Sequence, residues 1–320
     1  MTEMNEYIQL SHNDLDGAGC AIVIQSKFYV ETTIHSNYND IVNNLQNIDS
    51  IVTNHTKAVF ITDLNFDEKC FVELVRVASH HPHTKFVYVD HHPYEGRLGK
   101  LLERIKEVEN ISVHHTTEIC ATKICFQMIK SNDEDLSKFV DWVDSFDVWR
   151  QDSPLFDTGW VLNTIFWEIK MSGFKYNIQS NNYKIPKYFF TMYNDLMVKK
   201  EKMYKGMEAN NLFVREGDIM VAFSDGYKTF FQIDFPEYKV HILPFLSSNN
   251  ISVRISSTVN NSEKLKEDIL ALVNGYPNLV SAGGHPYAFG ITIKKEAPKD
   301  DVIGLIQKIM EISQLHIDTN

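Results

Sequence analysis

The sequence predicts an α/β protein that begins with a parallel sheet. Short apolar segments at 6–11, 58–65 and 85–90 alternate with segments of helical periodicity, a pattern typical of βαβ units. Helical patterns then dominate from 117 to about 210, and strand patterns return after that. We therefore expect an N-terminal parallel-sheet domain joined by a helical linker to a smaller α/β domain.

The individual elements follow from apolar periodicity and turn residues. In the first half we expect strands and helices in alternation: strands at 6–11, 30–36, 58–65 and 85–90, and helices at 18–29, 39–50 and 67–79. In the C-terminal part we expect strands at 218–225, 239–246, 251–257 and 287–295, and helices at 262–274 and 300–314. A glycine-rich turn, SAGGHPYAFG, is expected at 281–290. The expected domains are 1–150, a linker at 151–210, and 211–320.

Composition and charge narrow the classes of function. The chain has 320 residues and a net charge of −11, which disfavours binding of long duplex nucleic acid through its phosphates but not of short single-stranded oligonucleotides. The four cysteines show neither zinc-site nor disulfide spacing. We find no signal peptide and no apolar run of the roughly 20 residues that cross a bilayer. We therefore expect a cytoplasmic protein without a membrane partner.

Acidic and histidine side chains follow three of the expected strands. Because carboxyl ends of parallel strands meet at one edge of a sheet, these side chains should converge: His12, Asp14 and Asp16, then Asp63, then Asp90, His91 and His92. Crowded carboxylates repel one another unless cations lie among them. Aspartate and histidine without cysteine favour Mn²⁺, with Mg²⁺, Co²⁺ or Zn²⁺ also compatible. Taken alone, the first motif is equally compatible with a capped turn.

The tripeptide His-His-Pro occurs twice, at 80–82 and 91–93. The second copy follows a strand that ends in Asp90, and we expect it at the acidic cluster. The first copy ends a helix at the opposite edge of the sheet. There we expect it to cap helix carbonyls and to face solvent.

These motifs together resemble the DHH phosphoesterases that carry a DHHA1 domain. SHNDLDG, the aspartate of ITDLN, VDHHP and SAGGHPYAFG occur in the family's order and span residues 12 to 290. D-H-H alone is a weak signal, but the combination is specific. The resemblance implies a parallel-sheet metal-binding domain linked to a smaller α/β substrate-binding domain.

The resemblance also implies roles for the motif residues. One ion would be held by His12, Asp14 and Asp63, and a second by Asp16, Asp63, His91 and an aspartate of a fourth motif. His92 would face the scissile phosphate, and Asp90 would orient a histidine from behind. FDVWR resembles a segment of the nanoRNase branch and favours Asp147 as the fourth-motif ligand, with Asp144 and Asp157 as alternatives.

In the second domain, Gly283, Gly284 and His285 resemble the family's substrate-binding loop. Glycines let the backbone approach a phosphate closely. Arg254 matches the position of an arginine that binds the substrate's phosphate or terminal nucleotide, a task suited to its planar fork.

The expected function is a metal-dependent phosphodiesterase that releases mononucleotides from short RNA or DNA oligonucleotides. Two divalent ions would generate the attacking hydroxide and neutralise the phosphoryl centre. The alternatives are a phosphatase of 3′-phosphoadenosine 5′-phosphate, a phosphodiesterase of linear or cyclic dinucleotides, and, from another class, a catalytically silent nucleotide-binding regulator. A homodimer is compatible with the sequence.

Overall fold

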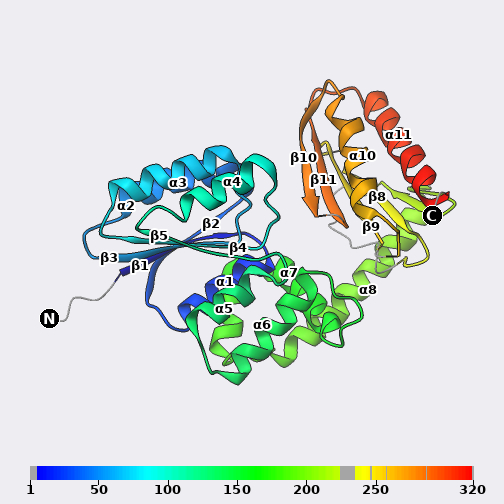
Figure 1. The fold of residues 1–320 in the computed structure, drawn as a ribbon. Helices are drawn as coiled ribbons and strands as arrows, with labels where there is room; N and C mark the ends of the chain where they lie inside the picture. Colours follow the sequence, from blue (N-terminus) through cyan, green and yellow to red (C-terminus); the bar gives the residue numbers. More distant parts are fainter. Residues whose placement is uncertain (1–5, 224–234, 246, 257, 286, 319–320) are drawn as a thin grey trace. The chain divides into compact units, whose positions relative to one another are not determined.

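The computed structural model describes residues 6–223, 235–245, 247–256, 258–285 and 287–318. The chain divides into two compact units, Met1–Leu196 and Met197–Asn320, which are described separately below (Figure 1). The three-part division expected from the sequence remains a prediction.

The first unit is built on a five-stranded sheet in which every neighbouring pair is parallel. Its strand order is β2-β1-β3-β4-β5. The strands are β1 (Glu6–His12), β2 (Val30–Ser36), β3 (Thr56–Thr62), β4 (Lys85–Asp90) and β5 (Ile111–His115). The parallel sheet expected from the apolar segments is confirmed.

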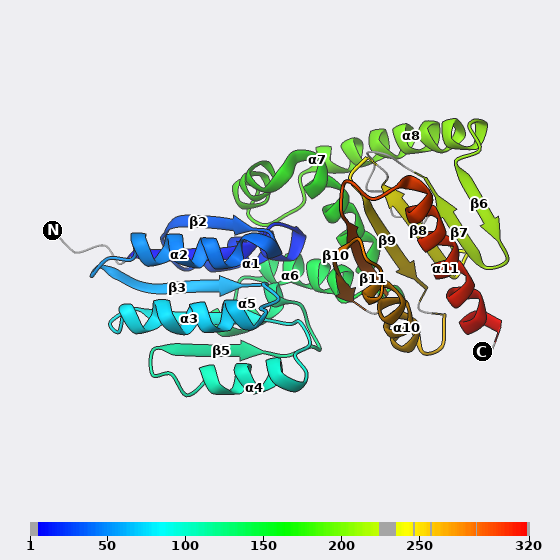
Figure 2. The same cartoon turned by 90° about the horizontal axis from the view of Figure 1, so that it is seen from above.

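Helices cover both faces of this sheet (Figures 1 and 2). One face carries α2 (Ile41–Ile51), α3 (Glu68–His80) and α4 (Gly96–Ile105). The other carries α1 (Leu15–Gln25), α5 (Ala121–Ile129), α6 (Glu134–Asp147) and α7 (Phe156–Ser180). Both layers bury the sheet, which explains why β3 and β4 are buried almost throughout. A short 3₁₀ helix, η1 (Tyr38–Asp40), follows β2.

Several boundaries in the first unit differ from expectation, among them the end of α1 at Gln25 instead of 29, and two of them lie at the motifs. Helix α1 begins at Leu15, not at 18, because the Asp14 side chain caps it by accepting from Gly17 N at 2.9 Å. Strand β3 ends at Thr62, because Asp63 has a left-handed backbone with φ 58°. Aspartate is among the few residues that adopt this conformation readily. The polar motif residues therefore set the local structure.

The second unit has a six-stranded mixed sheet of order β10-β11-β9-β8-β7-β6, in which β7 and β8 are parallel and the other pairs antiparallel. Its strands are β6 (Phe213–Glu216), β7 (Ile219–Ala222), β8 (Val240–Phe245), β9 (Asn250–Ile255), β10 (Leu279–His285) and β11 (Ala288–Ile293). The last residues of the expected strands 218–225, 239–246 and 251–257 lie outside the described residues.

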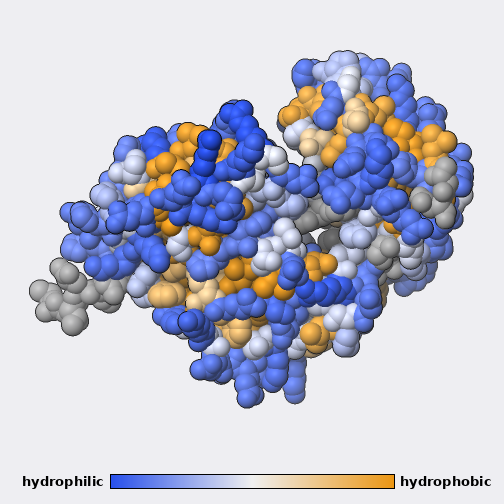
Figure 3. All heavy atoms as spheres, viewed as in Figure 1, coloured by the Kyte–Doolittle hydropathy of each residue, from blue (hydrophilic) through white to orange (hydrophobic). Residues whose placement is uncertain are grey.

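Side chains alternate between the two faces of this sheet. One face packs on α10 (Ser262–Asn274) and α11 (Lys299–Asp318) through residues such as Val253, Leu265 and Leu305. On the other, Met220 and Leu243 cluster with Met207 of α8 (Lys187–Ala209). In Figure 3 apolar residues also reach the surface along α11, where Leu315 is exposed beside a groove of about 790 Å³ lined also by β6 and β7.

The expectation of a glycine-rich turn at 281–290 was wrong at 281–285, whereas the overlapping strand expected at 287–295 is present as β11. Residues up to His285 form β10, and Gly283 pairs directly with Gly290 of β11. Glycine marks a turn and a sheet with close backbone approach equally well, so the local pattern could not separate the two. Among the described residues, no helix combines the length and apolarity that crossing a membrane requires.

Candidate metal centre

Side chains from four separate segments converge at the carboxyl edge of the first sheet. They form three overlapping groups whose nitrogen and oxygen atoms lie within 4.8 Å of one another: His12, Asp14 and Asp63; Asp63, His91 and His92; Asp16, His91 and Asp147. The first three motifs end β1, β3 and β4, and the fourth ends α6. The structure thus brings together seven of the predicted metal-site and catalytic residues.

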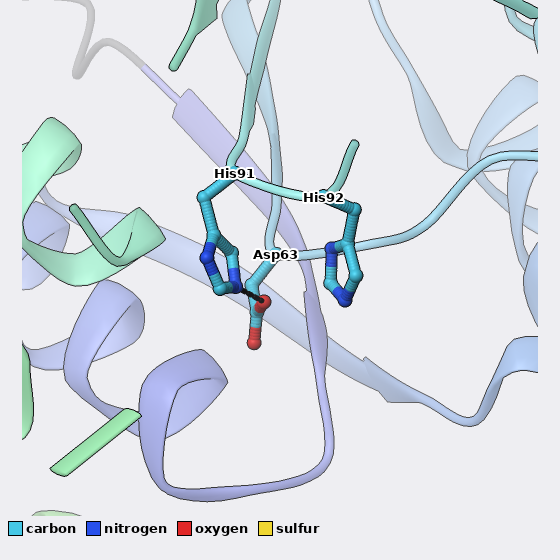
Figure 4. Close-up of side chains that lie close together, drawn as sticks. All are labelled: Asp63, His91 and His92. Atoms are coloured by element: carbon cyan, nitrogen blue, oxygen red, sulfur yellow. Dashed lines mark ion pairs between the residues drawn. The ribbon is translucent and has the colours of Figure 1, made fainter. Parts of the chain in front are cut away.

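Asp63 is shared by two of these groups. One carboxylate oxygen, Oδ1, lies 3.5 Å from His91 Nε2, and the other, Oδ2, lies 3.7 Å from His12 Nδ1. Oδ2 is buried without a hydrogen-bond partner among the described residues. Figure 4 shows the rings of His91 and His92 beside this carboxylate. The two oxygens of Asp63 therefore face two different sets of side chains.

His91 lies against three carboxylates. Its Nε2 is 3.4 Å from Asp147 Oδ2, 3.5 Å from Asp63 Oδ1 and 3.7 Å from Asp16 Oδ2. These separations are long for hydrogen bonds but close to the roughly 3–3.5 Å between atoms that share a cation at about 2.0–2.2 Å. Burial alone lowers the pKa of His91, but the carboxylates, Asp147 foremost, raise it well above its usual range.

Two of the carboxylates next to His91, those of Asp16 and Asp147, have raised pKa values. Burial, followed by repulsion from Asp63, raises the pKa of Asp16 to about 7. Burial and repulsion from Asp16 likewise raise the pKa of Asp147 well above its ordinary value. Each of these carboxylates is difficult to ionise without compensating positive charge. A divalent cation would supply that charge.

The N-terminus of α5 orients Asp16. Its Oδ2 accepts from Ala121 N and its Oδ1 from Thr122 N, both at 2.8 Å. The Thr122 hydroxyl donates to the Asp16 carbonyl at 2.7 Å. Helix N-termini stabilise anions through their free amides and the helix dipole. Sequence reasoning missed this support, because Asp16 and Thr122 are 106 positions apart.

His12 and Asp14 form a tight pair, with His12 Nδ1 2.7 Å from Asp14 Oδ2. Burial alone lowers the pKa of His12, but Asp14 and Asp63 raise it to about 11. Gly17 of the same motif is required sterically, since a Cβ there would lie 2.1 Å from the His12 carbonyl oxygen. The capped turn and the ligand cluster are therefore the same structure.

His92 is held by a chain of hydrogen bonds behind it. Its Nδ1 lies 2.9 Å from Asp90 Oδ1, and Asp90 Oδ2 accepts from Tyr94 at 2.6 Å and Tyr88 at 3.1 Å. Burial raises the pKa of Asp90, yet the adjacent His92 and these contacts lower it overall. His115 Nε2 lies 2.7 Å from the His92 carbonyl oxygen. Asp90 thus contacts His92. The sequence predicted that Asp90 orients a histidine, without identifying which one.

Sequence reasoning missed Tyr88 and Tyr94. A signal for Tyr88 existed, because it lies two residues before Asp90 on the same strand and so points to the same face. For Tyr94, beyond the strand, no local pattern was available.

The fourth motif separates into two aspartates with different surroundings. Asp147 lies against His91. Asp144 is buried and instead accepts from Cys120 N at 2.8 Å, pairs with Lys123 Nζ at 3.1 Å and contacts Arg150. Asp157, in the first turn of α7, is exposed and belongs to none of the three groups among the described residues.

The first His-His-Pro copy lies elsewhere. His81 Nε2 is 2.9 Å from Asp49 Oδ1 and 3.1 Å from the Asp49 carbonyl oxygen, and His80 Nδ1 is 3.2 Å from the same carboxylate. Arg76 also binds Asp49, at 2.8 Å. The side chains of the pair are partly exposed to solvent and bind the last turn of α2. The backbone N–H of His81, the C-cap residue of α3, donates to the Ala78 carbonyl at 3.2 Å.

In the second unit, Arg254 lies on the sheet face opposite Val253 and Ile255, which are core residues. Arg254 is partly buried without an ion pair among the described residues, and burial lowers its pKa to about 10. Its cross-strand neighbours are His241 and Ala288. An unpaired guanidinium in such a place favours an anionic partner.

The glycines of the predicted substrate loop have different surroundings. A Cβ at Gly283 would meet nothing within 4 Å, so the backbone there borders open space. Gly284 has φ 140°, and a Cβ would lie 2.6 Å from the Ala288 carbonyl oxygen, so only glycine fits. The His285 side chain lies outside the described residues.

Comparison with solved structures places this fold among known proteins. The pGpG-specific phosphodiesterase PggH from Vibrio cholerae matches with a TM-score of 0.53 and 15% identity over 96% of this chain and 99% of that one. RecJ from Thermus thermophilus, in complex with Mn²⁺, matches with a TM-score of 0.52 and 10% identity, over 97% of this chain and 52% of RecJ. No protein-family model matches the sequence, and no curated protein does.

At these identities the likeness is one of fold. The chain shares its α/β fold with PggH and RecJ, in agreement with the DHH/DHHA1 fold that its motifs predicted. The nanoRNase branch of that family stays a prediction.

Proposed function

We propose that this protein is a metal-dependent phosphodiesterase that hydrolyses short RNA or DNA oligonucleotides to mononucleotides. The observation that carries the proposal is the position of Asp63, whose two oxygens face His91 and His12 respectively. A carboxylate placed between two ligand sets is typical of two-metal sites in phosphoryl transfer. The fold shared with PggH and with RecJ supports the same class of reaction.

The side chains fit divalent cations. Asp63 Oδ2 and Asp147 Oδ2 are buried without hydrogen-bond partners among the described residues, and such orphaned carboxylate oxygens are costly unless a cation or proton compensates them. Oxygen and imidazole ligands without cysteine favour Mn²⁺, with Mg²⁺, Co²⁺ or Zn²⁺ compatible. We assign one ion to His12, Asp14 and Asp63, and the second to Asp16, Asp63, His91 and Asp147.

Two bound ions would supply the nucleophilic hydroxide and neutralise charge on the phosphoryl group. His92 would donate from its ring to a phosphoryl oxygen, since Asp90 holds its other nitrogen and fixes the ring orientation. Asp90 acts through His92 and is a positioning residue. We also propose that the protein acts in the reducing cytoplasm, as its cysteine spacing indicates.

The second unit would bind the substrate's phosphate or terminal nucleotide. Arg254 supplies a cation without an ionic partner among the described residues, and Gly283 supplies backbone that borders open space. We include Gly284 and His285 among the substrate-binding residues because they belong to the same motif as Gly283.

A dinucleotide is the second candidate substrate. The observation that favours it is the match to a pGpG-specific phosphodiesterase along almost the full length of both chains. The phosphodiester chemistry would be the same, and only the length of the substrate would differ.

Hydrolysis of an end-labelled RNA pentamer, linear pGpG and 3′-phosphoadenosine 5′-phosphate with Mn²⁺ tests the proposal. We expect a ladder of mononucleotide losses from the pentamer that disappears in Asp63→Asn. Cleavage of pGpG alone would replace the oligonucleotide with the dinucleotide. Quantitative Mn²⁺ binding without turnover of any substrate would contradict an enzyme and support a nucleotide-binding regulator.

A further inference from the structure

A tyrosine outside every motif lies at the metal centre. Tyr38 is in η1, two residues beyond Ser36, which pairs with His12 across β2 and β1. Its ring stacks on the His12 ring with centroids 4.4 Å apart and planes at 28°. It also meets the His92 ring edge-on at 6.1 Å. Tyr38 therefore contacts the first and third motifs at once.

The Tyr38 hydroxyl lies 3.4 Å from His92 Nε2. This is long for a hydrogen bond from a hydroxyl, which is strongest near 2.7–2.9 Å. A phenol with an ordinary pKa of about 10 keeps its proton at neutral pH. The hydroxyl is thus a donor that this contact engages only weakly, while the residue as a whole remains 47% exposed.

The Tyr38 hydroxyl lies on the side of the His92 ring opposite to Asp90. Asp90 takes up the Nδ1 side of His92, so the Nε2 side, next to the Tyr38 hydroxyl, is the one directed at an incoming group. Two donors separated by 3.4 Å can both reach the oxygens of one phosphoryl group at normal hydrogen-bond lengths. Because Asp90 accepts from Nδ1, His92 Nε2 donates only from the imidazolium form of the ring. Preoriented donors of this kind stabilise charge that develops on those oxygens in the transition state.

We propose that Tyr38 is a further catalytic residue, whose hydroxyl donates a hydrogen bond to a phosphoryl oxygen of the substrate beside His92. This inference rests on the proposed phosphodiesterase function. The ring has a separate task, since its stacking on His12 supports a ligand of the first ion. The hydroxyl acts on the reacting phosphate, and the ring acts on the metal site.

Tyr38→Phe separates these two tasks, because it removes the hydroxyl and keeps the stacked ring. The matched control is Tyr29→Phe: Tyr29 is 65% exposed and precedes the same strand at its other end. The measurements are kcat and KM on the cleaved substrate, Mn²⁺ affinity by calorimetry without substrate, and the affinity of the Mn²⁺-loaded protein for orthovanadate, which mimics a phosphoryl group in transfer.

For Tyr38→Phe we expect kcat to fall about 10²-fold, the usual cost of one such donor. KM and Mn²⁺ affinity should stay within about twofold, and vanadate affinity should fall with kcat. Tyr29→Phe should match the wild type throughout. An unchanged kcat and vanadate affinity would overturn the inference, as would a loss of Mn²⁺ affinity that accounts for the loss of rate.

The two proposals fail separately. If the wild type cleaves no substrate of the panel, the proposed function fails, and vanadate still decides the role of Tyr38. Weaker vanadate binding in Tyr38→Phe then supports a phosphoryl contact, and equal binding rejects it.

Discussion

The two His-His-Pro segments have the same three residues and opposite surroundings. At 80–82 the tripeptide ends α3, and its histidines bind Asp49 at the partly exposed end of α2. At 91–93 it follows β4, and its histidines are buried beside Asp63 and Asp90. In a parallel α/β unit, a strand delivers its last residues to the edge where ligands bind, and a helix delivers its last residues to the opposite edge.

The contrast teaches that the partner carboxylate, not the histidine pair, separates a surface ion pair from a candidate metal centre. Asp49 shares its charge with Arg76 and solvent. Asp63 is 1% exposed and has a buried oxygen without a hydrogen-bond partner among the described residues. Buried charge of that kind requires compensation, whereas the exposed pair is worth about 0–1 kcal/mol.

The strongest test of this contrast replaces Asp63 and Asp49, each in a separate variant, by asparagine. Asp63→Asn should abolish hydrolysis and reduce bound Mn²⁺, because it removes the charge between the two ligand sets. Asparagine tolerates the left-handed backbone of Asp63, so the fold should remain. Asp49→Asn should retain full activity. Hydrolysis of the best substrate and metal content of both purified variants decide this, and equal activity would contradict the metal centre.

The histidines can be exchanged in the same way. Residues that only support metal ligands typically cost 10–100-fold in affinity or activity when replaced, so His91→Gln should cost at least about 100-fold in Mn²⁺ affinity. His80→Gln should leave that affinity unchanged. Calorimetric titration with Mn²⁺ measures both, and similar losses in the two variants would remove the distinction between the copies.

Two aspartates of the fourth motif, Asp147 and Asp144, test which carboxylate belongs with the second His-His-Pro segment. Asp147→Asn should weaken Mn²⁺ binding and stabilise the metal-free protein, because it removes repulsion from Asp16. Asp144→Asn should lower the melting temperature, because Lys123 and Arg150 lose their shared buried partner. Melting curves with chelator, combined with metal titration, separate these effects. The reverse pattern would make Asp144 the ligand.

The smallest expected effect is a pH dependence of the metal-free protein. The folded-state pKa of Asp16 is about 7, above its unfolded value near 3.9, so the folded state binds the extra proton and loses stability as pH rises from about 4 to 7. His12, raised to about 11, loses its contribution between about 6.5 and 11. Both shifts have the same sign.

The melting temperature in chelator should therefore fall from about pH 5 to about pH 8. Saturating Mn²⁺ should remove or reverse this trend, because cations then replace the protons. A melting temperature that rises with pH in chelator would show that the cluster does not carry these raised pKa values.

Local patterns were sufficient for much of the fold and part of the site. Apolar periodicity identified β1, β2, β3 and β4 to within a few residues, and the polar residues after three of them placed the first three motifs at one edge. These inferences needed only the alternation of strands and helices and the rule that parallel strands end together.

Other features depended on contacts between distant segments. The amides of Ala121 and Thr122 reach Asp16 only because α5 packs on α1, and Tyr38 reaches His12 only because β2 lies beside β1. Local residue patterns do not encode strand order or helix packing, so neither contact could be predicted. The predicted turn at the glycines of β10 was wrong for a related reason, since their strand conformation depends on pairing with β11.

The sequence by itself determined which residue types end each strand, and hence that an acidic, histidine-rich edge would form. Only the tertiary structure decided that Asp63 faces two sets of side chains and that Asp147 of α6 lies beside His91. The same is true of Tyr38, whose ring stacks on His12. The physical reason is that periodicity records the burial of each element, whereas a site is made by the order and packing of elements far apart in the chain.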